Sequence, residues 1–175
     1  MANYKTPQIV NRENSANAQQ MNNPQYGGMS NVYFVAAQWL VNASVLAADT
    51  VEMLRLPSSS RILSIWDKHE SLGTTLTFSL GLATPVTGGA PTTPSSSTVL
   101  GGISIAGQTA RTSFVLVGNW GSNGVTKTGV ANFLWQLLGL ATDPGGEIVF
   151  CLFPNGVTAP TASASCVMLL MVQVD

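Results

Sequence analysis

Charged residues are scarce in this sequence. Only 9% of its 175 residues are Asp, Glu, Lys or Arg, whereas about 25% is typical of a globular domain. The net charge of −1 provides no basic surface of the kind that binds nucleic acid and no basic cluster that attracts membrane lipids. Interface cores are poor in charge, so the composition fits a surface covered by protein partners. We therefore expect protein partners, no nucleic acid and no membrane.

Side chains that perform chemistry are also scarce. The sequence has one histidine and two isolated cysteines. The densest group of titratable residues is Asp67-Lys68-His69-Glu70, whose mixed charges predict a solvated turn, with metal ligation or acid–base catalysis as the alternative. No Gly-x-Ser-x-Gly motif and no phosphate-binding glycine loop occurs. We expect no enzyme, no catalytic residue, no bound metal and no cofactor.

Long hydrophobic segments are missing too. No apolar stretch follows the first residues, and the longest unbroken apolar run, Cys166–Val172, is far shorter than the roughly 20 residues of a membrane-spanning helix. We expect a protein made in the cytoplasm, where a disulfide is not the default. If the last two predicted strands form a hairpin, Cys151 and Cys166 would lie close together across it. A bond or a metal there is the alternative to two buried apolar side chains.

The polar residues are concentrated at the N-terminus. Residues 1–30 are crowded with Asn and Gln and carry too few apolar side chains to offset the entropy of ordering. We therefore expect an extended arm that folds only against a partner, followed by one domain over residues 31–175. Four side chains of the arm are candidate anchors for that partner: Tyr4, Ile9, Val10 and Tyr26.

The rest of the chain consists of short apolar segments separated by Gly, Ser, Thr and Pro. Strict alternation over residues 75–80 places Leu76, Phe78 and Leu80 on one face of a strand. Similar spacing elsewhere, with no long helix, predicts an all-β, antiparallel, jelly-roll-like β-sandwich. Strands are expected at 31–46, 51–56, 61–67, 75–80, 112–117, 130–138, 147–153 and 162–174.

Two of these strands, EIVFCLF and SCVMLLMVQV, are apolar on both faces. In an antiparallel sheet one face usually meets water. The second face of each strand must therefore be covered by the arm, by a loop or by another subunit. In the third case, Met168, Leu170 or their neighbours would face that subunit, and a trimer is the expected assembly.

The four tryptophans fall into two groups. Trp39, Trp66 and Trp135 lie within predicted strands, so we expect them in the core. Trp120 lies in a Gly- and Asn-rich turn. Its ring is either an exposed contact for a sugar or a partner pocket, or it folds over the end of the sandwich.

Three consecutive stretches of the chain resemble a known pattern. They are ADTVEMLRLP at 48–57, SSSRILSIW at 58–66 and TTLTFSLG at 74–81, and GGEIVF at 145–150 also fits. Together they resemble small structural proteins of tailed bacteriophages, in which a strand that begins at Asp ends in Leu-Pro. The matching residues carry the fold, and no binding residue transfers from them.

This resemblance implies a capsid cement, or decoration, protein. Such a protein would be a non-enzymatic jelly-roll trimer, made in the host cytoplasm, that binds the outer surface of the virion and stabilises contacts between major capsid subunits. A head fibre, a neck or a tail component is the alternative within virions. A carbohydrate-binding β-sandwich module that uses Trp120 is the alternative from another class.

Overall fold

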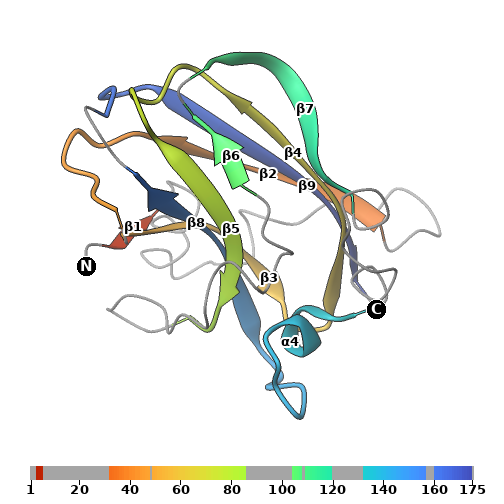
Figure 1. Cartoon of the computed structure of the whole chain (residues 1–175). Helices are drawn as coiled ribbons and strands as arrows, with labels where there is room; N and C mark the ends of the chain where they lie inside the picture. The colour runs from red at the N-terminus through yellow and green to blue at the C-terminus, as the bar shows by residue number, and fades with distance from the viewer. Residues whose placement is uncertain are drawn as a thin grey trace, which may run out of the picture.

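The computed structural model describes residues 3–5, 32–47, 49–85, 104–107, 109–119, 132–156 and 160–174. These residues form nine strands and one short helix, α4 (Leu134–Leu137), which lies near one end of the sandwich (Figure 1). The strands are β1 (Asn3–Lys5), β2 (Val32–Leu40), β3 (Thr50–Pro57), β4 (Ser60–His69), β5 (Thr77–Ala83), β6 (Ser104–Ala106), β7 (Arg111–Asn119), β8 (Glu147–Asn155) and β9 (Ser165–Val174).

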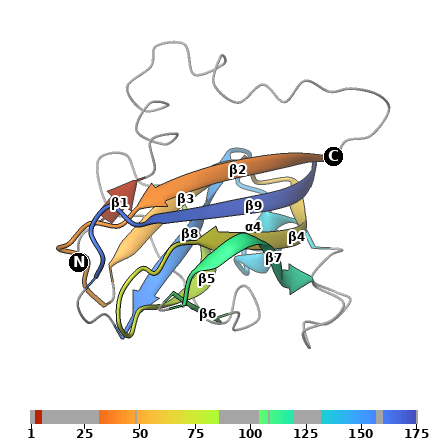
Figure 2. The same ribbon diagram turned by 90° about the horizontal axis from the view of Figure 1, so that it is seen from above.

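The strands make two sheets that lie face to face as two layers (Figure 2). The five-stranded sheet has the order β1-β3-β8-β5-β6, and the four-stranded sheet has the order β2-β9-β4-β7. Strands β2 to β9 pair only in antiparallel fashion, while β1 pairs in parallel with β3. This division of eight strands between two sheets is that of a jelly roll. The predicted all-β, jelly-roll-like sandwich is therefore confirmed.

The main core lies between the two sheets. Leu76, Phe78 and Leu80 are all buried, as their alternation predicts. The ring of Phe78 on β5 meets the ring of Trp39 on β2 edge to face, with centroids 5.7 Å apart, so one aromatic pair joins the layers. Strand β3 ends at Pro57, because proline has no N–H to continue the ladder.

The segment predicted as a strand at 130–138 is the largest local error. Its described part, residues 132–138, turns into α4 instead. Gln136 Oε1 accepts the backbone N–H of Phe133 at 2.9 Å, which satisfies a donor at the start of the helix. Gly139 follows with φ +73°, a left-handed conformation that ends helices. The apolar alternation of this segment did not reveal these two capping features.

The hairpin that would bring Cys151 and Cys166 together does not form. Strand β8 lies in the five-stranded sheet and β9 in the four-stranded sheet. Cys151 pairs with Glu52 and Gly81, whereas Cys166 pairs with Trp39 and His69. The two thiols are buried in opposite layers and are free. The connection crosses the sandwich, so no cross-strand bond or shared metal joins them.

Three residues of the predicted arm belong to a sheet. Strand β1 runs beside β3 with Tyr4 opposite Val51 and Lys5 opposite Glu52. Lys5 Nζ lies 4.0 Å from Glu52 Oε1, and Arg55 Nη2 donates to Glu52 Oε2 at 3.3 Å. Since Glu52 is fully buried, these cations compensate its carboxylate. Residues 6–31 of the predicted arm lie outside the described residues.

Candidate functional site: the outer face of the four-stranded sheet

Strand β9 buries one face and exposes the other. Cys166, Met168, Leu170 and Val172 point into the sandwich and are buried, whereas the side chains between them are partly exposed. Of the residues expected to face another subunit, Met168 and Leu170 face the core instead, and their neighbours stay a prediction. If a partner lies on this strand, it contacts the alternate residues Val167, Leu169 and Met171.

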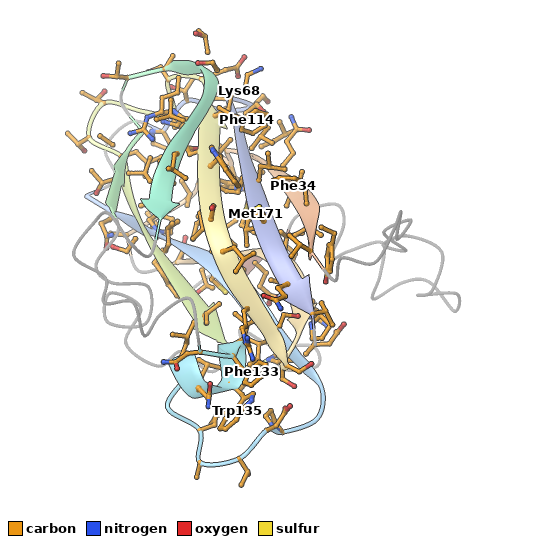
Figure 3. The ribbon with its side chains drawn as sticks, turned by 90° about the vertical axis from the view of Figure 1, so that its right-hand side faces the viewer. Phe34, Lys68, Phe114, Phe133, Trp135 and Met171 are labelled. Atoms are coloured by element: carbon orange, nitrogen blue, oxygen red, sulfur yellow. The ribbon has the colours of Figure 1, made fainter. Side chains whose placement is uncertain are left out.

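The alternate residues of β9 continue an apolar surface across all four strands. Phe34 of β2 pairs with Met171 of β9, and Leu169 of β9 pairs with Trp66 of β4. The Phe34 and Trp66 rings approach to 5.8 Å. We call this surface the apolar strip, and Figure 3 shows the sheet from this side. Its members are Phe34, Trp66, Phe114, Leu116, Leu169 and Met171.

The apolar strip is open to solvent. Phe34 is 59% exposed, Phe114 45% and Leu116 44%. Trp66, expected in the core, lies on this outer face beside Phe34, while Trp39 is buried as predicted and Trp135 packs against the rim of the core. A contiguous apolar surface of aromatic, Leu and Met side chains is typical of protein interfaces.

Strand β7 adds an unusual sheet edge to this surface. It lies at one end of the order β2-β9-β4-β7, and residues 112–116 are all exposed. Val115 lies on the opposite face from Phe114 and Leu116 and is still 41% exposed. Natural edge strands usually carry charge or proline that prevents pairing, but residues 112–119 contain neither. This edge is therefore suited to contact with another chain.

A charged cluster lies at the His69 end of the sheet. Arg111 Nη1 donates to Asp67 Oδ2 at 3.0 Å, and His69 Nε2 lies 3.2 Å from the same oxygen. Asp67 is fully buried and His69 nearly so. The predicted solvated turn is wrong here, because β4 continues through His69 and places Asp67 and His69 on its inward face beside Arg111 of β7.

The surroundings of His69 favour the charged imidazolium. Burial alone lowers the pKa of His69 and is the largest single effect. Hydrogen bonding to Asp67 and to the Glu70 carbonyl, together with the Asp67 charge, outweighs burial and raises the pKa above its usual value. The geometry gives the reason: Nδ1 lies 2.7 Å from the Glu70 carbonyl oxygen and Nε2 faces a carboxylate. Both ring nitrogens donate only in the protonated form.

Beside this cluster the outer face is hollowed. The hollow has a volume of about 510 Å³ and is lined by residues of β2, β4, β7 and β9 and by Glu70 and Ala110, which lie next to the ends of β4 and β7. Glu70 Oε2 accepts the backbone N–H of Ser165 at 2.8 Å, and Gln38 Nε2 donates to Ser165 Oγ at 2.8 Å. The Lys68 ammonium, also in the lining, lies 6.0 Å from the Phe114 ring. The hollow therefore joins a polar end to the apolar strip.

An aromatic pair lies at the opposite end of the same sheet. The rings of Phe133 and Trp135 are nearly parallel, with centroids 6.4 Å apart. The Arg61 guanidinium lies 4.2 Å from the centre of the Phe133 ring, an attractive cation–π geometry. Figure 3 shows both rings at the α4 end, far from Lys68.

The candidate anchors from the sequence are mostly untested. Tyr4 lies in β1 opposite Val51. Ile9, Val10, Tyr26 and the candidate loop contact Trp120 lie outside the described residues. Sequence reasoning missed the apolar strip, although a signal was present: FVLV at 114–117 is apolar without alternation, which leaves apolar side chains on both faces of a strand.

Other chemistry finds little support in the described part of the chain. Those residues contain no group of three His, Cys, Asp or Glu side chains that could hold a metal ion. Burial raises the pKa of both Cys151 and Cys166 far above the usual value, so neither thiol is an activated nucleophile. No helix among the described residues is long and apolar enough to cross a membrane.

One solved structure shares this fold, and two others are more distantly similar. A chain of the capsid of Ralstonia phage GP4 is similar with a TM-score of 0.62 and 14% identity, over 99% of each chain. A chain of the cyanophage Pam1 capsid has a TM-score of 0.44 and 18% identity, covering 92% of this chain and 98% of that one. A chain of the acidic stable capsid of Helicobacter pylori bacteriophage KHP30 has a TM-score of 0.37 and 11% identity, covering 82% and 87%. The last two are too distant to carry an argument.

The first similarity extends over nearly the whole chain. At 14% identity it shows a shared fold, and at that level it confirms the resemblance to phage structural proteins. No protein-family model matches the chain, and no curated protein matches its sequence.

Proposed function

We propose that this protein is a non-enzymatic structural component of a bacteriophage virion, and more specifically a capsid cement protein. It would bind the outer surface of the shell and stabilise contacts between major capsid subunits. Two observations support this: the fold is shared with a chain of the Ralstonia phage GP4 capsid, and the described residues offer a broad apolar surface on the four-stranded sheet.

The apolar strip is the observation that carries the proposal. Six large apolar side chains on four strands leave a hydrophobic surface in water, and burying it against a subunit would stabilise the contact by about 25 cal/mol per Å² of apolar area. With only 9% charged residues, the protein depends on burial more than on electrostatic attraction. Contacts of this kind resist salt, which suits a protein that reinforces a shell.

The arm and the oligomeric state extend the proposal. Strand β1 holds residues 3–5, including Tyr4, on this chain's own sheet; residues 6–30 would reach a neighbouring capsid subunit through Ile9, Val10 and Tyr26, and the domain over 31–175 would be a homotrimer. Three linked sandwiches multiply a weak contact by effective concentration. Light scattering should give three times the mass of one chain, and a clean monomer would contradict this part of the proposal.

The arm can be tested without disturbing β1. We expect Ile9→Ser, Val10→Ser and Tyr26→Ser, combined in one variant that keeps residues 3–5, to leave the melting temperature nearly unchanged. Binding to shells should fall at least about tenfold, or about 1.4 kcal/mol. Unchanged binding would mean that the arm anchors nothing and that the sandwich alone makes the contact.

The central experiment measures binding of the purified protein to virion shells assembled without it. Leu116→Ser removes an apolar side chain from the strip, and Leu46→Ser removes one that is 65% exposed elsewhere. We expect the first change to weaken binding about tenfold, because one buried leucine contributes about 1.5–3 kcal/mol. The second should have no effect, and equal loss in both would show that the strip is not the contact.

Copy number separates the virion roles. Hundreds of copies per particle are expected for a cement protein, whereas a few copies would indicate a head fibre, neck or tail component. Absence from particles, with binding to glycans by the isolated protein, would instead indicate the carbohydrate-binding module.

A further inference from the structure

We infer that the hollow beside Lys68 holds an acidic side chain of the capsid subunit that covers the apolar strip. The inference rests on the proposed function and adds to it the chemistry of the partner: a segment in which a carboxylate stands next to apolar residues.

Cationic residues surround the hollow. Lys68, His69 and Arg111 belong to its lining, and Glu70 is the one acidic residue there. Asp67 lies buried behind them. Lys68 and Arg111 balance Glu70 and Asp67 when His69 is neutral, and a proton on His69, whose two ring nitrogens both face acceptor oxygens, brings the group to +1. The hollow is therefore a local site for an anion on a protein that has little charge.

The carboxylates near the hollow already have hydrogen-bond partners within the protein. Asp67 Oδ2 accepts a hydrogen bond from Arg111 Nη1 at 3.0 Å, and the Cys166 thiol lies 3.8 Å from Asp67 Oδ1. Glu70 Oε2 accepts the Ser165 backbone N–H at 2.8 Å. Lys68, by contrast, is exposed, and its Nζ lies 6.0 Å from the centre of the Phe114 ring. An exposed ammonium has three N–H donors that an incoming carboxylate can accept.

Several side chains of the hollow are held rigidly in place. Arg111 is anchored on a fully buried carboxylate, and His69 is held between that carboxylate and the Glu70 carbonyl. Gln38 is fixed by its bond to Ser165 Oγ at 2.8 Å. Side chains that are already positioned lose little entropy when a ligand arrives, so a single carboxylate can bind with useful affinity.

The apolar surroundings of the hollow favour a polypeptide as the partner. The hollow opens directly beside the apolar strip, with Val167 in its lining and Phe114 against Lys68. A ligand that fills the hollow would lie next to apolar side chains. A Glu or Asp within an apolar segment meets both conditions, because its carboxylate would lie in the hollow and its neighbours would lie on the apolar strip. A nucleic-acid backbone repeats its charge along its length, and the strip offers no further cation for it.

The test compares two identical substitutions at opposite ends of the sandwich. Thr112→Glu places a carboxylate in the hollow, and Ala141→Glu places one in the exposed turn beyond α4. Both lower the net charge by one unit. We expect Thr112→Glu to weaken binding to shells lacking this protein at least about tenfold, while Ala141→Glu binds as wild type does. Both should melt at the wild-type temperature because both positions are exposed.

Zero-length cross-linking identifies the partner group directly. A carbodiimide activates a carboxylate and joins it to a lysine amine as an amide. On shells, Lys68 should become linked to an Asp or Glu of the major capsid subunit, as detected by mass spectrometry of the cross-linked peptides. Lys68→Arg should bind like wild type, because the charge is kept, but should lose the cross-link. Lys68→Gln should bind more weakly.

The outcomes distinguish this inference from the proposed function. If the wild type binds shells but Thr112→Glu and Ala141→Glu bind equally well, the hollow takes no carboxylate, and the function stands. If short single-stranded DNA displaces Lys68-dependent binding, the anion is a phosphate, and the inference is wrong. If the wild type fails to bind shells at all, the proposed function fails, and the inference fails with it.

Discussion

Strands β8 and β9 look alike in the sequence but have different surroundings in the fold. Both are apolar on both faces. From Ile148 to Pro154 every residue of β8 is buried, whereas β9 alternates between buried and partly exposed residues along its length. The outward residues of β8, Val149, Cys151 and Phe153, form a second small core with Ala83 of β5. The outward residues of β9 belong to the apolar strip.

The difference shows which apolar face the fold leaves partly exposed. An apolar residue that the fold itself buries explains stability. One that the fold leaves in water calls for another explanation, and for β9 the explanation that we propose is docking. The contrast can be tested residue by residue.

The largest expected effect lies within β9, between adjacent leucines. Leu170→Ala should lower the free energy of unfolding by about 2–5 kcal/mol, because it opens a cavity in the core. Leu169→Ala on the outer face should cost less than about 1 kcal/mol. Urea denaturation of both variants measures this, and a similar loss in both would mean that the outer face is already buried in the free protein.

The charged end of the sheet offers a second contrast. Arg111→Met leaves the fully buried Asp67 without its guanidinium partner and should destabilise the fold by about 2 kcal/mol, less than for a fully buried pair, because the Arg111 side chain is 29% exposed. Lys68 follows Asp67 in the chain and is exposed, so Lys68→Met should change the free energy of unfolding by no more than about 0.5 kcal/mol. Equal effects of the two changes would remove the structural role of the Asp67 cluster.

The pH dependence of stability should reveal His69. Its pKa is raised in the folded state, so the folded state binds the proton more tightly than the unfolded chain does. The stabilisation is complete below the ordinary histidine pKa of about 6.5 and is lost as the pH rises through the higher folded value. Between pH 5 and pH 9 the melting temperature should fall more steeply with pH for the wild type than for His69→Gln. The same pH dependence in both proteins would contradict this.

The smallest effect is expected at the thiols. Cys151 and Cys166 are buried in opposite sheets with raised pKa values, so a thiol reagent should leave both unmodified in the native protein at neutral pH. Both should react once the chain is unfolded. Rapid modification of either thiol in the native state would show that its sheet opens to solvent.

Local sequence patterns determined most of the strands. Alternation identified the core face of β5, and Pro57 marked the end of β3, because side-chain period and the missing proline N–H act within a few residues. The same reasoning missed α4, whose short turn depends on Gln136 and Gly139 as caps. An apolar run without those caps in view fits either structure.

Tertiary structure decided the site. The spacing of apolar segments indicated an all-β body, and the composition indicated partners and little chemistry. The sequence does not reveal that β8 and β9 lie in different sheets, or that Asp67 and His69 meet Arg111 from β7. Which apolar face is covered depends on how strands far apart in the chain are paired and stacked. Burial is a property of that packing, so only the folded molecule separates the core from the surface offered to a partner.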